Sequence, residues 1–317
     1  MVEITYLDAI RRAHFDEMRR DSRVFVIGED VGHYGGAFRV TQGLMDEFGP
    51  QRVIDAPIAE SAIVGAALGA CHVGLRPIVE FQFIDFITCA FNIIVQFVAK
   101  NRWRVGIPVP MVMRGPCGAG LHAGPFHSQT PEAWFAHCPG LKVVMPATPE
   151  DACGLLKSAV RDDDPVVFLE HKFLYRRIKG DVSGEPVPLG KARIVREGRD
   201  LTVVTYGAML HTVLEATAGF DAEVIDLRTL YPLDRAAIVE SVRKTSRLMI
   251  VHEDTRSGGL AGEIAAIVND EAFDALDAPI VRVTAPDTPV PFAPVLEETF
   301  IPSVKDVTMA AHSLLRY

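Results

Sequence analysis

The chain has 317 residues, 49% of them hydrophobic and 23% charged, a composition typical of a globular protein with room for two domains. Its net charge of −9 argues against a nucleic-acid-binding protein, which needs a basic face. A membrane span is not expected, because polar residues interrupt every stretch approaching the roughly 18 apolar residues that a span requires.

Short apolar, β-branched runs alternate along the chain with stretches of helical spacing. The first half predicts strands at 24–27, 53–54, 77–81, 109–113, 142–145 and 166–169, and helices at 6–20, 61–73, 84–103 and 149–160. Thr5 and Thr148, the latter followed by Pro149, are of the residue types that begin helices. Buried strands alternating with helices predict an α/β fold with a parallel sheet covered on both faces.

Residues 179–190 (KGDVSGEPVPLG) contain three glycines and two prolines and show neither helical nor strand periodicity, which favours a linker. The alternation then resumes, with strands expected at 201–205, 223–226, 248–251 and 280–283. We therefore expect two doubly wound domains, residues 1–180 and 191–317, joined by a linker at 181–190.

The five cysteines (Cys71, Cys89, Cys117, Cys138 and Cys153) include no C-x-x-C pair. An odd number of scattered cysteines in a long chain indicates a reducing compartment. The first fifteen residues have neither the apolar core of a signal peptide nor the Arg/Ser-rich character of a transit peptide. These features favour a bacterial cytoplasmic protein, or as a second choice a processed mitochondrial matrix chain.

A glycine-rich stretch, RGPCGAGLHAG at 114–124, lacks the spacings of nucleotide-binding loops and is interpreted as a mobile loop near a site. Nearby histidines and cysteines raise zinc as an alternative, but their spacing does not match paired zinc ligands. His127, at the end of the loop, is either an ordinary loop residue or a proton-transfer group, for which imidazole is suited near neutral pH.

Glu60 lies between a strand and an apolar helix. It is either a first-turn glutamate favoured by the helix dipole or a carboxylate directed into a cleft at the carboxyl end of a strand. The segment 80–86 (EFQFIDF) favours core packing, with stacking on a flat ring as the alternative. Asp162-Asp163-Asp164 is typical of a solvated turn, although such oxygens also hold hard cations.

Together these segments resemble one family along nearly the whole chain and in the same order. The matching segments are GEDVG at 28–32, RVIDAPIAES at 52–61, GLRPIVEFQF at 74–83, HSQTPEAWFAHCPGLKVV at 127–144, VIDLRTLYPLD at 224–234 and DAPIVRVTAPDTPVP at 277–291. They are similar to beta subunits of the decarboxylating component of 2-oxo acid dehydrogenase complexes.

The resemblance implies a pyrimidine-binding thiamine-diphosphate domain followed by a transketolase C-terminal-like domain. It also implies that an alpha subunit holds the pyrophosphate and its magnesium through a Gly-Asp-Gly motif and a downstream Asn. That motif is absent here; the nearest match, Gly180-Asp181, lacks the second glycine. The chain is therefore expected to need an alpha partner, in a heterotetramer of two alpha and two beta chains.

Carried over residue by residue, the resemblance implies that Glu60 bonds the pyrimidine ring and favours its imino tautomer. Phe86 then stacks on the ring, Gln82 is a neighbouring contact, and His127 is the active-site histidine. The family also binds a potassium ion, mainly through main-chain oxygens. These ligands fall on Met111, Ala159, Val160, Asp162 and Asp164.

The implied activity is oxidative decarboxylation of a small 2-oxo acid, with transfer of the acyl group to a lipoyl group on an acyltransferase component. Pyruvate and branched-chain 2-oxo acids are both compatible, with acetoin as an alternative substrate. Two other functions remain open: a self-contained transketolase-like enzyme and a non-catalytic docking subunit. The missing pyrophosphate motif argues against the first, and the presence of Glu60, Phe86 and His127 against the second.

Overall fold

The structure, a computed structural model, describes residues 2–317 and divides the chain into two compact units. The first unit contains the chain up to Cys117 and Trp134–Leu189, and the second contains Gly118–Ala133 and Gly190–Tyr317. A boundary between the units lies between Leu189 and Gly190, inside the predicted linker 181–190. The difference is the segment 118–133, called here the His127 loop, which the sequence had assigned to the first domain.

The first unit is built on a parallel sheet in which the strands follow the order β6-β7-β5-β4-β2-β3. Its strands are β2 (Val24–Gly28), β3 (Val53–Asp55), β4 (Arg76–Glu80), β5 (Val112–Cys117), β6 (Lys142–Val144) and β7 (Val166–His171). Every residue of β2, β4, β5 and β7 is buried, as expected for a parallel sheet covered on both faces. β5 begins three residues later than predicted and extends into the glycine-rich stretch.

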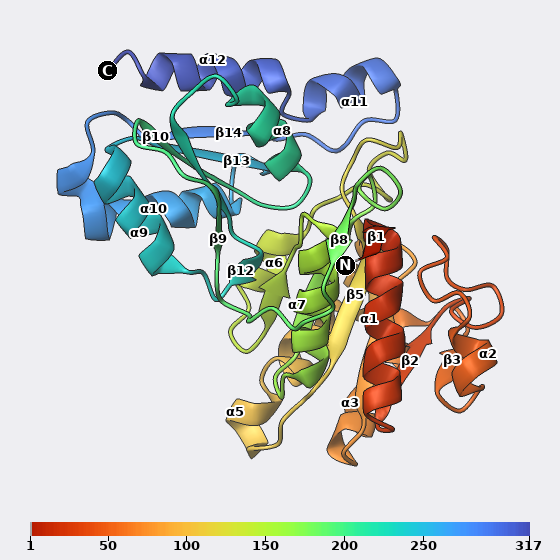
Figure 1. The fold of residues 1–317 in the computed structure, drawn as a ribbon. Helices are drawn as coiled ribbons and strands as arrows, with labels where there is room; N and C mark the ends of the chain where they lie inside the picture. The colour runs from red at the N-terminus through yellow and green to blue at the C-terminus, as the bar shows by residue number, and fades with distance from the viewer. Residues whose placement is uncertain (1) are drawn as a thin grey trace. The chain divides into compact units, whose positions relative to one another are not determined.

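The helices of this unit begin close to the predicted residues. They are α1 (Tyr6–Arg20), α2 (Leu44–Phe48), α3 (Glu60–His72), α4 (Phe91–Ile93), α5 (Asn101–Val105), α6 (Glu132–Ala136) and α7 (Pro149–Arg161), with the 3-10 helix η1 (Ile84–Ala90) and the π-helix η2 (Ile94–Val98). The Thr5 and Thr148 side chains accept backbone N–H bonds at the starts of α1 and α7, which confirms both predicted N-caps. α1 and α7 pack side by side (Figure 1).

Two details differ from the sequence expectations. Residues 179–182, predicted to be linker, form β8 (Lys179–Val182), which pairs antiparallel with β1 (Val2–Thr5). The segment Ile84–Val105 is long and apolar enough to cross a membrane by length and composition, a test that core helices of soluble proteins also pass. Its succession of 3-10, α and π turns includes the polar residues Asp85, Asn92 and Gln96.

The second unit contains a five-stranded sheet in the order β14-β13-β10-β11-β9, with only β9 antiparallel to its neighbour. Its strands are β9 (Arg193–Arg196), β10 (Leu201–Thr205), β11 (Ala222–Asp226), β13 (Leu248–Thr255) and β14 (Val281–Ala285), and β12 (Thr229–Tyr231) lies between β11 and β13 in the chain. α8 (Met209–Ala216) and α12 (Val304–Leu314) lie on one face, and α9 (Arg235–Thr245) and α10 (Leu260–Ala272) on the other (Figure 1).

Stability at acid pH should depend on His14, a fully buried residue of α1 whose Nδ1 donates to the Ile10 carbonyl at 2.8 Å. Burial, and then the charge of Arg114, lower the His14 pKa from 6.5 to about 3. Between these values the unfolded chain binds a proton that the native chain does not, so stability falls as pH drops through this window. As pH decreases, the free energy of unfolding of the His14→Gln variant should fall less steeply than that of the wild type. The difference between the two free energies should change by about 3 kcal/mol between pH 7 and 4.

Urea unfolding at several pH values measures this difference. The matched control is His33→Gln, at an exposed histidine of the same unit. Parallel pH profiles for the wild type and His14→Gln would contradict the assignment.

Candidate functional site

The carboxyl ends of β2, β3 and β4 lie at one edge of the first sheet, because these strands are parallel neighbours. Glu29 follows β2, Glu60 begins the helix after β3, and Gln82 follows β4. Glu60 and Gln82 are half-buried, whereas Glu29 is only 7% exposed. The parallel sheet therefore brings three polar side chains together at the edge where α/β folds bind ligands.

Hydrogen bonds between the loops hold this edge in place. The Asp55 side chain accepts the Gly32 N–H at 2.6 Å, which joins the end of β3 to the loop after β2. Gln82 Nε2 donates to Asp30 Oδ2 at 2.9 Å, which joins the loops after β4 and β2. Asp30 adopts a positive φ of 57°, a backbone conformation uncommon outside glycine. The loop after β2 is thus fixed to both neighbouring strands.

Glu29 is the functional candidate that the sequence reasoning missed. One of its carboxylate oxygens, Oε1, is buried without a hydrogen-bond partner. Burial raises the Glu29 pKa, and the charges of Glu60 and then Asp30 raise it further. A negative charge close to a carboxyl group disfavours ionisation of that group, which is the direction of the Glu29 shift. The signal in the sequence is the acidic pair Glu29-Asp30 directly after the buried strand β2.

The aromatic side chains beside this edge form a short series. Phe86, in η1, meets Phe83 edge to face with ring centroids 6.3 Å apart, and Phe83 meets Phe38 in the same way at 5.4 Å. The Phe86 ring is half-buried, so part of it remains available to a flat ligand. The predicted aminopyrimidine contacts Glu60, Gln82 and Phe86 therefore all belong to one edge of the first unit.

The residues at this edge fit the aminopyrimidine of thiamine diphosphate. Such a ring needs a carboxyl group for a ring nitrogen, further polar contacts and an apolar surface against its face. Glu60, Gln82 and Phe86 are of these three types, and the unpartnered Glu29 oxygen adds a polar atom that the protein itself leaves unsatisfied. No Gly-Asp-Gly motif for the pyrophosphate occurs in the 317 residues.

A buried ion-pair network lies directly behind this edge. Arg114 of β5 donates to Glu80 at the end of β4 and to both oxygens of Glu170 on β7. Tyr175 also donates to Glu170, at 2.7 Å. Arg114 and Glu170 are fully buried. Burial raises the Glu80 pKa to about 6, although the charge of Arg114 opposes the shift. Arg114 thus joins β4, β5 and β7, and its contact on β4, Glu80, lies two residues before Gln82.

His127 belongs to the second unit, together with the rest of the His127 loop. It is half-buried, and its backbone N–H donates to the Gly124 carbonyl at 3.4 Å. In the part of the chain that the structure describes, no group of three or more His, Cys, Asp and Glu side chains could hold a metal ion. All five cysteines are free.

Several of the predicted potassium ligands lie around the turn after α7. Arg76 donates to two of their carbonyl oxygens. Arg76 donates from Nε to the Val160 carbonyl at 2.9 Å and from Nη2 to the Asp162 carbonyl at 2.7 Å. The Met111 carbonyl accepts the Val166 N–H, and the Ala159 carbonyl accepts the Asp162 N–H. The Asp164 side chain pairs with Arg102. The potassium site stays a prediction. A potassium ion there would share the Val160 and Asp162 carbonyl oxygens with the Arg76 guanidinium.

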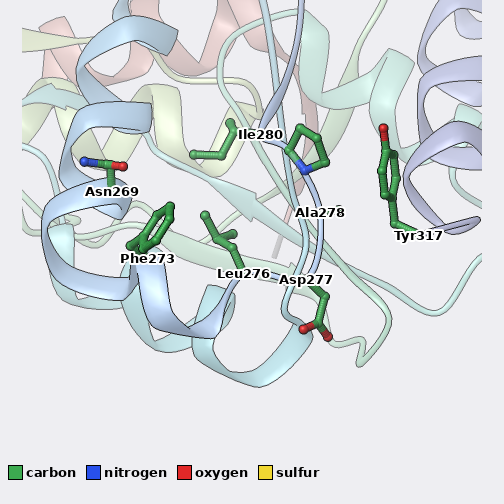
Figure 2. Close-up of a pocket in the computed structure, with 8 residues that line it drawn as sticks. Asn269, Phe273, Leu276, Asp277, Ala278, Ile280 and Tyr317 are labelled. Atoms are coloured by element: carbon green, nitrogen blue, oxygen red, sulfur yellow. The ribbon is translucent and has the colours of Figure 1, made fainter.

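A separate pocket of about 510 Å³ lies in the second unit. Its lining residues are Asn269, Phe273, Leu276, Asp277, Ala278, Pro279, Ile280 and Tyr317. Figure 2 shows Phe273 and Leu276 next to each other, with the Asp277 carboxylate directed away from them. None of the predicted site residues lines this pocket, so it has no part in the cofactor site described above.

Comparison with known proteins covers the chain from end to end. The family "Transketolase, pyrimidine binding domain" matches residues 2–177, and "Transketolase, C-terminal domain" matches residues 190–307. The chain is 49% identical over 327 residues to the 2-oxoisovalerate dehydrogenase subunit beta of Bacillus subtilis, with 100% of both chains covered. It is 47% identical to the pyruvate dehydrogenase E1 component subunit beta of Rickettsia conorii, covering 100% of this chain and 99% of the relative.

A solved structure described as "Split gene transketolase, inactive beta4 tetramer" superposes with a TM-score of 0.82 at 23% identity, covering 99% of this chain and 98% of the other. At this identity the similarity shows the fold alone. It agrees with the two predicted α/β domains of transketolase type.

Proposed function

This chain belongs to the beta subunits of 2-oxo acid dehydrogenase E1 components, and from that premise we propose that it supplies the pyrimidine-binding half of a thiamine-diphosphate-dependent active site. The observation that carries this proposal is the grouping of Glu60, Gln82 and Phe86 with the partly unsatisfied Glu29 at one sheet edge. The reaction is oxidative decarboxylation of a small 2-oxo acid.

Each residue at the edge has a separate task. Glu60 bonds a ring nitrogen of the aminopyrimidine, and Glu29 beside it is a second carboxyl group whose pKa is raised by burial and by the charge of Glu60. Phe86 and Gln82 orient the ring. When bound, thiamine diphosphate supplies the electron sink for decarboxylation. His127 holds or transfers a proton while the acyl group moves to the lipoyl group of the acyltransferase component.

An alpha subunit completes the site by holding the pyrophosphate and magnesium, in a tetramer of two alpha and two beta chains. Two properties of the first unit support a large partner surface. Ile58, Val73, Phe97 and Trp103 are large apolar residues with strongly exposed side chains, Trp103 at 95%. The helix α3 also exposes small residues such as Ala66 and Gly69, which permit close packing. Exposed apolar surface of this kind marks association sites.

Co-expression with an alpha subunit tests this function. The purified alpha–beta complex should decarboxylate pyruvate or 3-methyl-2-oxobutanoate when thiamine diphosphate, Mg²⁺ and dichlorophenolindophenol as electron acceptor are added, whereas the beta chain alone should not. Acetoin is assayed in parallel, since oxidation of acetoin alone would identify the alternative substrate. Tight binding of thiamine diphosphate and Mg²⁺ by the beta chain alone, measured by calorimetry, would contradict the divided site and favour a self-contained enzyme.

A further inference from the structure

The His127 loop runs from the end of β5 into the first two residues of α6 and belongs to the second unit. Its hydrogen bonds to Glu253, Glu297 and Tyr206 all lie within the second unit. The loop lies against α11 (Pro294–Phe300), as Figure 1 shows. The loop is therefore held by residues 74 to 177 positions away in the sequence.

Glu297 contacts the loop on the N-terminal side of His127. This side chain of α11 is only 1% exposed. Its carboxylate accepts the backbone N–H of Gly120 at 3.0 Å and that of His122 at 3.1 Å. The His122 imidazole Nδ1 lies 2.6 Å from the same carboxylate. Hydrogen bonds to an ionised acceptor are roughly twice as strong as neutral ones, so Glu297 organises this turn.

The turn that Glu297 holds has an uncommon backbone conformation. His122 has a φ of +57°, and Gly118, Gly120 and Gly124 also have positive φ. Successive N–H groups in such conformations form a concave site for an anion, and here the anion is the Glu297 carboxylate. The Gly124 carbonyl at the end of the turn then accepts the His127 N–H. A chain of contacts thus leads from Glu297 to the backbone of His127.

Other contacts fix the two ends of the loop. Glu253 Oε1 accepts the Ala119 N–H at 2.6 Å, and Ala119 packs in a small apolar cluster with Phe300 of α11. On the other side of His127, Tyr206 donates to the fully buried Glu132 at 2.8 Å. Between these two ends, Glu297 accepts the backbone N–H groups of Gly120 and His122 and so holds the turn before His127.

We propose that Glu297 is a positioning residue for His127. Glu297 acts through the turn 120–124, and His127 takes part in acyl transfer to the lipoyl group. This proposal rests on the proposed function, because it requires that His127 take part in that step. Glu297 touches neither substrate nor cofactor in this role. Its loss should therefore slow the step that uses His127 and leave decarboxylation itself unchanged.

The test uses the co-expressed alpha–beta complex carrying Glu297→Gln, which keeps the size of the side chain but removes its charge. We expect kcat for reductive acylation of a lipoylated domain to fall roughly 10- to 100-fold. The KM for that domain, and decarboxylation measured with dichlorophenolindophenol as electron acceptor, should stay unchanged. Amide hydrogen exchange of residues 118–126 should become faster. The matched control is Glu298→Gln, at the exposed neighbour on the same helix.

Two results would overturn the proposal: Glu297→Gln behaving like Glu298→Gln, or an equal loss of both activities together with a lower Tm, which indicates a purely structural role. His127→Ala separates these outcomes from a failure of the proposed function. If His127→Ala is impaired in acyl transfer while Glu297→Gln is not, positioning by Glu297 is wrong. If His127→Ala is fully active, the role assigned to His127 is itself wrong, and with it the positioning role.

Discussion

Replacing Glu60 by Gln should reduce turnover of the alpha–beta complex roughly 100-fold or more, the range attributed to loss of a positioned acid–base group. The amide keeps the size of the side chain but cannot hold or release the proton that a carboxyl group exchanges with a pyrimidine nitrogen. Glu60 is half-buried at the sheet edge, so the variant should fold normally. Steady-state decarboxylation with thiamine diphosphate and Mg²⁺ present measures the effect.

Glu263→Gln is the matched control for Glu60→Gln, because each residue is a glutamate in the first turn of a helix. If Glu60 only complements the helix dipole, both variants should keep their activity and lose at most about 1 kcal/mol of stability. Near-normal turnover of Glu60→Gln would make the assignment wrong. Thermal unfolding of both complexes shows whether any loss of activity arises from loss of structure.

Replacing Arg114 by Leu should lower the free energy of unfolding by roughly 3–5 kcal/mol, the cost of removing one member of a buried ion pair. Glu80 and Glu170 would remain buried without their counter-charge. This loss is a large fraction of the roughly 5–15 kcal/mol by which a native domain is stable. The variant should therefore unfold at a far lower urea concentration. Because Arg114 also contributes to the lowered His14 pKa, stability below pH 6 should depend less steeply on pH in the variant.

The control for Arg114→Leu is Arg235→Leu, which breaks an ion pair whose side chains are more than one-third exposed. Exposed pairs contribute about 0–1 kcal/mol, so this variant should unfold close to the wild type. A second variant replaces Arg114, Glu80 and Glu170 together by Leu, since removing all charges avoids burying an unpaired one. If Arg114→Leu is no less stable than Arg235→Leu, the buried network does not stabilise the fold.

Much of the first unit could be predicted from local patterns. Buried parallel strands need continuous apolar runs, and α1 and α7 begin at threonines that accept backbone N–H bonds. β8 was missed because its sequence, KGDV, carries no apolar alternation; it forms through pairing with β1. The start of β5 was predicted too early because the apolar run begins at Val109, whereas pairing with β4 begins only at Val112.

The candidate site was predictable in part. Glu60, Gln82 and Phe86 follow strands, and a sheet of parallel strands brings such residues to one edge. Glu29 also follows a strand, but its significance lies in an unpartnered oxygen and in the charge of Glu60, neither of which a linear pattern expresses. The roles assigned to Glu60 and His127 remain predictions that the variants above test.

The sequence by itself determined two α/β domains, the residues at the carboxyl ends of the strands and the absence of a pyrophosphate motif, because burial and strand order leave local patterns. Only the tertiary structure decided that the His127 loop is held by the second unit and that Arg114 joins three strands. Those contacts link residues 134 and 177 positions apart in the loop and 34 and 56 positions apart in the network. Specific pairings over such separations depend on how the whole chain folds, and no local pattern records them.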